Sequence, residues 1–142
     1  MWRIVVDLKD IGFYKSNSKN AASKPRTDVE KICSQNGFSI ITIYSHFFAK
    51  TPKGIWELFL KKLNALGIIL QSLRLVFLRD SIILVQYPFL NHRMQDIVQY
   101  LKKRNKIVVL YHDLYNLRIG SNNSFENWLI RNSDVNIVHS ES

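Results

Sequence analysis

The chain has 142 residues, of which 46% are hydrophobic and 22% are charged, and its formal net charge is +9. This composition is that of an ordinary globular domain and excludes an intrinsically disordered chain. The length is sufficient to bury one hydrophobic core. Cys33 is the only cysteine, which excludes an intrachain disulfide and favours a buried thiol in a reducing compartment.

The N-terminal segment predicts a β-strand over residues 2–7, because Trp2 opens a run of β-branched side chains. This run is too short, and has the wrong flanks, to be a signal peptide. The most apolar uncharged stretch, residues 63–73, is bracketed by Lys62 and Arg74. It falls short of the roughly 20 residues that span a bilayer. We therefore expect no transmembrane segment.

A helix is expected after the polar loop over residues 12–23. Pro25 lies early in this segment, Thr27 is the expected N-cap, and Glu30 stands at the capping-box position three residues later. Gly37 is expected to end the helix as its C′ residue, because glycine adopts the left-handed conformation without a steric penalty.

The rest of the chain alternates between apolar strand-like runs and segments of helical period. The expected elements are a strand over 38–44, an amphipathic helix that carries Trp56, Phe59, Leu60 and Leu63, a second, shorter helix over 66–77, a strand over 82–86, a helix over 92–104, a strand over 106–111, a short helix over 125–131 and a strand over 134–139. Strands that alternate with helices predict a parallel sheet covered on both faces. The fold class is therefore α/β, with a Rossmann-like doubly wound sheet of about five strands in one domain over residues 1–142.

Ligands of such sheets bind at the carboxyl ends of the strands, near the switch in strand order. The residues expected there are Gly12, Phe13, Tyr14 and Lys15 after the first strand, Gln86 and Tyr87 after the third, His112 and Asp113 after the fourth, and His139, Ser140 and Glu141 after the fifth. His112 in this position suits a general base for an acceptor hydroxyl, with Asp113 as the carboxylate that orients it. The alternative is structural: His112 is partly buried and Asp113 caps the following turn.

Several common catalytic and binding motifs are missing. The first loop contains Gly12 without the further glycines of a dinucleotide-binding turn, and neither a Walker loop nor a G-x-S-x-G elbow occurs. The four histidines are scattered without ligand spacing, so no metal site is expected. The sequence thus predicts no cofactor and no nucleotide site of the usual kinds.

The positive charge is compatible with nucleic acid, an anionic membrane surface or a phosphate-bearing substrate. Its densest cluster, Lys102, Lys103, Arg104 and Lys106, closes a predicted helix, where the helix dipole favours cations. Nucleic-acid binding is therefore disfavoured. Residues 56–77 contain more apolar side chains than one helix face of a small domain needs. Core packing, a partner subunit in a homo-oligomer, or peripheral contact with a membrane would each explain them.

Four motifs occur in an order that is similar to a known family. They are Ile11-Gly12-Phe13 followed by residues 22–29, the strand and turn over 80–88, the strand over 106–114 with its His112-Asp113 pair, and the closing strand over 132–140. In this order they resemble the N-terminal domain of bacterial β-1,6-galactofuranosyltransferase-like and related glucosyltransferase proteins.

The resemblance implies one half of a GT-B glycosyltransferase, in which two Rossmann-like domains enclose the active site. It implies that a C-terminal domain, not seen within residues 1–142, holds the nucleotide-sugar donor, typically a UDP-sugar, usually without a metal. This chain would then supply the acceptor side, in the cytoplasm or peripherally at the inner face of the membrane, and we expect it to be inactive alone. The alternative is a non-enzymatic Rossmann-like module for protein interaction or self-association.

Overall fold

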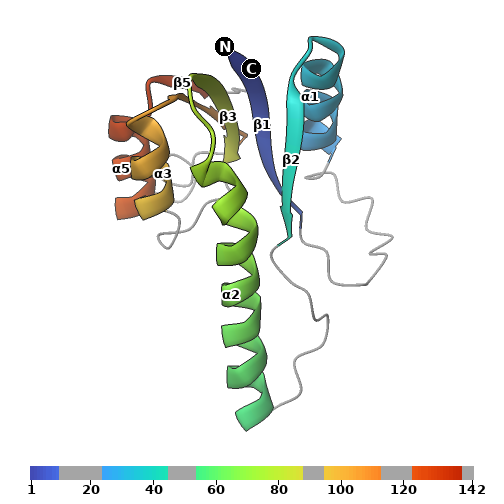
Figure 1. Ribbon diagram of the computed structural model, residues 1–142, viewed down its shortest axis with the longest axis vertical. Helices are drawn as coiled ribbons and strands as arrows, with labels where there is room; N and C mark the ends of the chain where they lie inside the picture. The colour runs from blue at the N-terminus through green and yellow to red at the C-terminus, as the bar shows by residue number, and fades with distance from the viewer. Residues whose placement is uncertain (10–23, 45–53, 88–94, 113–122, 139–142) are drawn as a thin grey trace.

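The computed structural model describes residues 1–9, 24–44, 54–87, 95–112 and 123–138. Its centre is a sheet of five parallel strands in the order β2-β1-β3-β4-β5 (Figure 1). The strands are β1 (Trp2–Lys9), β2 (Ser39–Tyr44), β3 (Ser81–Tyr87), β4 (Lys106–Tyr111) and β5 (Val135–Val138). The chain runs from β1 outward to β2 and then returns to β3 on the other side of β1. The predicted Rossmann-like α/β fold is confirmed.

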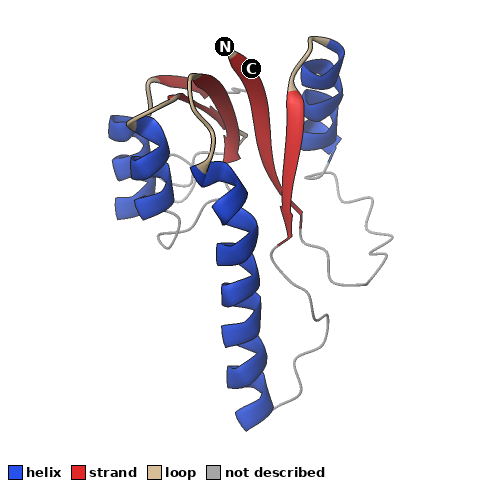
Figure 2. Cartoon of the chain, viewed as in Figure 1, coloured by secondary structure: helices blue, strands red, loops and turns tan. Residues whose placement is uncertain are grey.

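Helices cover both faces of the sheet (Figure 2). They are α1 (Lys24–Gln35), α2 (Ile55–Val76), α3 (Gln95–Lys102) and α5 (Ser124–Asn132). The main core lies on the face that α2, α3 and α5 cover, where Leu75, Leu101 and Leu129 pack against the apolar residues of β3 and β4. The α1 helix lies on the opposite face, where it contacts the end of β3.

The α1 helix begins at Lys24, so the prediction that Thr27 is its N-cap is wrong. Backbone N–H groups in the first turn of a helix have no intrahelical partner, so the missing N–H of Pro25 costs the helix no hydrogen bond there. The helix therefore includes Pro25 instead of starting after it. The predicted end is confirmed: Gly37 has a φ of 79°. Its N–H bonds the Ser34 carbonyl at 3.2 Å, and Phe38 N–H bonds the Cys33 carbonyl at 3.0 Å, which together form a Schellman motif.

Cys33 itself lies half-buried in α1, and burial raises the pKa of its thiol. A raised pKa leaves less of the reactive thiolate at neutral pH. The sequence predicted a buried thiol, and the structure leaves Cys33 half-buried.

A single helix, α2, replaces the two that the sequence predicted over residues 55–77. The expected interruption does not occur, because one interior glycine costs a helix only about 1 kcal/mol. One turn after Gly67, the Gln71 side chain donates to the Gly67 carbonyl at 3.1 Å. The same amide pairs with both backbone groups of Tyr44, at 2.9 and 3.0 Å, which fixes α2 to the end of β2.

Among the described residues no helix is long and apolar enough to cross a membrane.

Asn105 fixes the amino ends of the strands. Its side chain is buried, accepts from Ser81 N–H at 3.1 Å, and donates to the carbonyls of Leu78 and Leu101 at 3.0 Å each. One amide thus joins the start of β3 to the residues that follow α2 and to the end of α3. This connection holds the start of β3 beside the start of β4. The bounds of β4 are those that the sequence predicted.

Candidate functional site

The structure describes three of the residues that the sequence predicted for the site. They are Gln86 and Tyr87, which end β3, and His112, which directly follows β4. The other predicted residues lie outside the described ranges; they are Gly12, Phe13, Tyr14, Lys15, Asp113, His139, Ser140 and Glu141.

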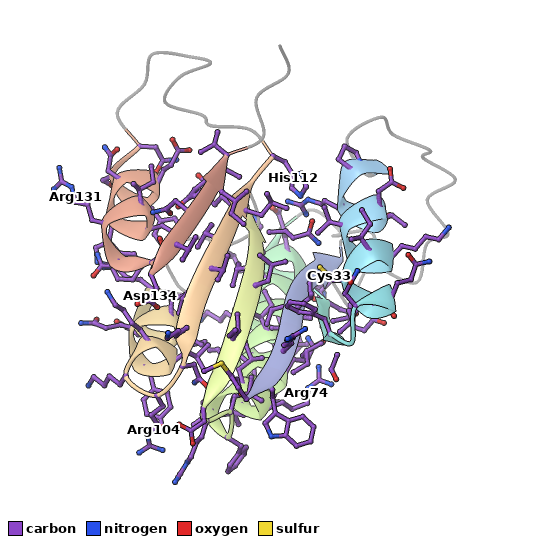
Figure 3. All side chains as sticks on the ribbon, turned by 90° about the horizontal axis from the view of Figure 1, so that it is seen from above. Cys33, Arg74, Arg104, His112, Arg131 and Asp134 are labelled. Atoms are coloured by element: carbon purple, nitrogen blue, oxygen red, sulfur yellow. The ribbon has the colours of Figure 1, made fainter. Side chains whose placement is uncertain are left out.

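Gln86 and His112 meet at the carboxyl edge of the sheet. Because Gln86 pairs with Leu110 in the register of β3 and β4, the side chains of residues 86, 110 and 112 share one face. The His112 Nε2 atom lies 2.6 Å from Gln86 Oε1. Figure 3 shows His112 at the end of β4, on the side of the sheet where α1 lies. The backbone N–H of His112 also bonds the Tyr87 carbonyl at 3.0 Å, so the ladder of β3 and β4 extends to the site.

The hydrogen-bond network assigns the orientation of both side chains. Gln86 is fully buried, and its Nε2 faces the Arg26 carbonyl of α1 at 3.5 Å, so its Oε1 faces His112. An amide oxygen only accepts, and therefore His112 Nε2 carries a proton. A neutral imidazole has one ring proton, which makes Nδ1 the basic nitrogen of His112. A buried amide thus fixes the tautomer of a half-buried histidine.

Tyr87 points away from this pair, because successive side chains of a strand lie on opposite faces. Its ring is buried with that of Tyr111, its partner in the sheet register, with ring centroids 5.3 Å apart. The Tyr87 phenol lies close enough to the Glu126 carboxylate of α5 for that carboxylate to act on its pKa. The structure therefore brings Gln86 and His112 together and places Tyr87 in the core.

Burial, then the charge of Glu126 and the hydrogen bond to it, raise the pKa of Tyr87 from 10.0 to about 12. Burial, then the charge of Glu126 and the Tyr87 phenol, also raise the pKa of Tyr111. The Ser133 hydroxyl acts weakly in the opposite direction. It lies outside hydrogen-bonding geometry with the phenol and bonds the Asn136 side chain at 2.6 Å. The Tyr111 hydroxyl is buried without a hydrogen-bond partner in the described part of the chain.

Sequence reasoning missed Glu126, a fully buried carboxylate in the first turn of α5. The available signal was Asn123, which is a preferred N-cap residue and is followed three positions later by glutamate. The structure confirms that Asn123 is the cap, since its Oδ1 accepts from the N–H groups of Phe125 and Glu126 at 3.1 and 3.2 Å. Burial of Glu126 depends on its packing against β3 and β4, which the local pattern does not encode.

The Gln86–His112 pair lies at the edge of the sheet where ligands of open α/β sheets generally bind. The pair lies at the carboxyl ends of β3 and β4, and β3 adjoins β1 where the strand order reverses. An open depression lined by Met1, Trp2 and Asn36 lies instead at the amino ends of β1 and β2, and so forms no part of this site. Within the described ranges no group of three His, Cys, Asp or Glu residues could hold a metal ion.

The fold is that of a Rossmann-like α/β domain with a five-stranded parallel sheet. Residues 11–142 match the family described as the glucosyltransferase 3-like, N-terminal domain. The match covers nearly the whole chain, and the chain belongs to this family. Searches of curated proteins and of solved structures found no match.

Proposed function

We propose that this chain is the acceptor-side half of a GT-B glycosyltransferase. In this proposal the enzyme transfers a sugar from a nucleotide donor, a UDP-sugar, to a hydroxyl of a glycan, a lipid-linked sugar or a protein. The observation that carries the proposal is the contact of Gln86 with His112 at the carboxyl edge of the sheet. Membership of the glucosyltransferase 3-like family supports the class of reaction. The resemblance to galactofuranosyltransferase-like proteins supports a hexose donor.

His112 is the general base in this proposal. As the acceptor hydroxyl attacks the anomeric carbon, its proton passes to Nδ1 of His112. A bond forms between the acceptor oxygen and the anomeric carbon, the bond from that carbon to the phosphate oxygen breaks, and UDP leaves. The imidazolium that results is stabilised by Gln86 Oε1, which already accepts from Nε2–H. Gln86 is thus a positioning residue, and Asp113 is proposed as a second group that orients the ring.

A second domain is proposed to hold the donor. Gly12, Phe13, Tyr14 and Lys15, together with His139 and Glu141, would line the acceptor side of the cleft between the domains. The net charge of +9 supports attraction to anionic headgroups, and we place the reaction in the cytoplasm at the inner face of the membrane. This placement would bring lipid-linked acceptors within reach of the site.

The test is a sugar-transfer assay with a panel of UDP-sugars, on this domain joined to a donor-binding domain of its family. His112→Asn should lower kcat by about 10²–10⁴ and leave the KM of the donor unchanged, because it removes proton transfer alone. Gln86→Leu should lower kcat less and shift its pH dependence. Cys33→Ser is the matched control with normal activity. A fully active His112→Asn variant, or transfer by residues 1–142 alone, would contradict the proposal.

The second candidate is a non-enzymatic module for protein interaction or self-association. The exposed apolar side chains of α2 favour it. It would replace the first candidate if the joined protein bound a partner through α2 and transferred no sugar from any donor of the panel.

A further inference from the structure

The end of the sheet opposite the Gln86–His112 site carries a cluster of basic side chains, which we call the amino-edge cations. They come from segments far apart in the sequence: the start of β1, the residues before β3, the end of α3 with the turn that follows it, and the start of β4. All six are exposed; they are Arg3, Arg79, Lys102, Lys103, Arg104 and Lys106. Figure 3 shows Arg104 at this end of the sheet and His112 at the other.

Backbone contacts hold these segments together along one edge. Arg3 pairs with Ile82 in the register of β1 and β3, and Ile82 pairs with Lys106 in that of β3 and β4. The backbones of Arg3 and Lys106 are therefore two strand spacings, or about 10 Å, apart. The Asp80 N–H bonds the Arg104 carbonyl at 3.0 Å, which joins the residues before β3 to the turn after α3. The cations thus lie on one continuous surface.

This surface has an excess of positive charge. Two carboxylates, those of Asp80 and Asp134, accompany the six cations and leave a net charge of +4. The Asp134 carboxylate already accepts from the Ile107 N–H at 2.7 Å. Within the described ranges no ion pair to a carboxylate involves any of the amino-edge cations. Much of the positive charge at this edge is therefore free to attract an anionic partner.

The dipole of α3 explains only part of the cluster. The C-terminus of a helix carries the equivalent of about half a negative charge, and its effect falls off within the last turn. It accounts for Lys102 and Lys103, at the end of α3, but not for Arg3, Arg79 or Lys106, which belong to other segments. A partner outside the described residues is a better explanation for the whole cluster.

Aromatic rings hold two of the guanidinium groups in place. Arg104 lies over the ring of Tyr100, 5.4 Å from its centroid, and Arg3 lies over the ring of Phe38 at 5.9 Å. Such stacking restricts the side chain without neutralising its charge. These two cations therefore lose less conformational entropy on binding than free arginine side chains do.

Exposed apolar side chains at the same edge identify the kind of partner. Met1, Trp2 and Phe77 are 75%, 72% and 82% exposed. Trp2 precedes Arg3, and Phe77 lies two residues before Arg79. Aromatic side chains enter the headgroup region of a bilayer, while neighbouring lysine and arginine side chains are attracted to anionic lipids. The combination is typical of a surface that lies on a membrane.

Nucleic acid fits this edge less well. Single strands bind along basic grooves whose aromatic rings stack on successive bases. The depression at this edge, lined in part by Trp2 and Asn36, includes one basic side chain, that of Arg3. The other cations therefore do not line a groove around the exposed ring of Trp2.

We infer that the amino edge of the sheet is a peripheral membrane-binding surface for anionic phospholipids. The amino-edge cations bind lipid phosphates, and Trp2 and Phe77 enter the headgroup layer. This inference rests on the membrane placement in the proposed function and assigns the surface responsible for it. The seven residues of β3 separate this surface from the Gln86–His112 site by roughly 20 Å. A lipid-linked acceptor must therefore carry a glycan long enough to span this distance.

Flotation of the 142-residue chain with lipid vesicles tests this inference. The vesicles contain phosphatidylcholine alone, or three parts phosphatidylcholine to one part phosphatidylglycerol. The chain should bind the second kind much more tightly than the first, and high salt should release it, because salt screens the attraction between exposed charges. Binding to neither kind, or equal binding to both, would overturn the inference.

Matched variants test the surface. Arg79→Gln with Arg104→Gln should weaken vesicle binding about thirtyfold, since each basic residue near an anionic membrane contributes about fivefold. Lys31→Gln with Lys61→Gln removes the same charge from exposed positions on α1 and α2 and should bind as the wild type does. Trp2→Ala should weaken binding about tenfold. Because all five side chains are exposed, the circular dichroism spectra should not change. Equal losses in the two double variants would overturn the inference, because net charge alone would then explain the binding.

The remaining outcomes separate this inference from its alternatives. Tighter binding to polyuridylic acid than to the vesicles would overturn it in favour of nucleic acid. Vesicle binding is measured without donor or acceptor, so its failure would leave the sugar-transfer test of the proposed function unaffected. A chain that binds vesicles through this edge and transfers no sugar when joined to its second domain would support the surface and contradict only the proposed reaction.

Discussion

The paired phenols of Tyr87 and Tyr111 allow a prediction in which one chemical change has opposite effects at neighbouring sites. A buried hydroxyl without a partner lacks about 1–3 kcal/mol of hydrogen bonding that it has in water. The Tyr111 hydroxyl is in this situation within the described residues, and its ring is fully buried. Tyr111→Phe removes the oxygen and keeps the ring. We therefore expect it to stabilise the fold by about 1 kcal/mol, which corresponds to a rise in Tm of roughly 2–4 °C at this chain length.

Tyr87→Phe is the matched comparison, because the Tyr87 hydroxyl, unlike that of Tyr111, is not among the buried groups without a partner, and the Glu126 carboxylate acts on its pKa. Its removal takes a polar group from beside the fully buried Glu126 and should destabilise the fold by about 1–3 kcal/mol. Urea unfolding followed by circular dichroism measures both changes as shifts in the midpoint at constant slope. If Tyr111→Phe destabilised the fold by 1 kcal/mol or more, the hydroxyl would have a partner and the reasoning would be refuted.

Three further predictions concern stability. The pKa of Tyr87 is about 12 in the fold against 10.0 unfolded. Its contribution to stability should therefore be constant below pH 10 and fall by on the order of 2–3 kcal/mol from pH 10 to 12. Unfolding at stepped pH should show a smaller fall in Tyr87→Phe. Asn105→Ala leaves the buried Ser81 N–H unpaired and should cost about 2–4 kcal/mol in urea, whereas an effect below 1 kcal/mol would show that water replaces the amide. Asn123→Ala removes the cap of α5 and should cost about 1 kcal/mol, with earlier hydrogen exchange in α5 than in α3; unchanged exchange would count against the cap.

The fold followed from local patterns that physical chemistry ties to one conformation. The β-branched runs of β1, β3 and β4 predicted strands, and Gly37 predicted a helix end, because each pattern has one low-energy solution. The predicted start of α1 and the predicted break within α2 were wrong, because the residues on which they rested do not force a single conformation. Neither Pro25 in a first turn nor Gly67 inside a helix costs enough to end a helix by itself.

The positions of Gln86 and His112 could be predicted from the sequence, and their role stays a prediction. Placing Gln86 and His112 at the carboxyl ends of neighbouring strands required only the alternation of strands and helices. To exclude Tyr87 from the site, one must know on which face of β3 its side chain lies. This depends on which face of the sheet carries the core. Burial of Glu126 and exposure of the apolar side chains of α2 are properties of tertiary packing. An apolar helix face has the same pattern whether it covers a core or a second molecule.

We propose above that His112 contacts the acceptor sugar, that the buried Gln86 positions its ring, and that the donor is held elsewhere. Nuclear magnetic resonance of the His112 ring and the Gln86 amide, in the 142-residue chain titrated with UDP and with methyl glycosides of glucose, galactose and N-acetylglucosamine, tests it most directly. We predict that at least one glycoside shifts both sets of signals, that Gln86→Leu abolishes the His112 shift, and that UDP shifts neither. Shifts with UDP, or none with any glycoside, would contradict the claim.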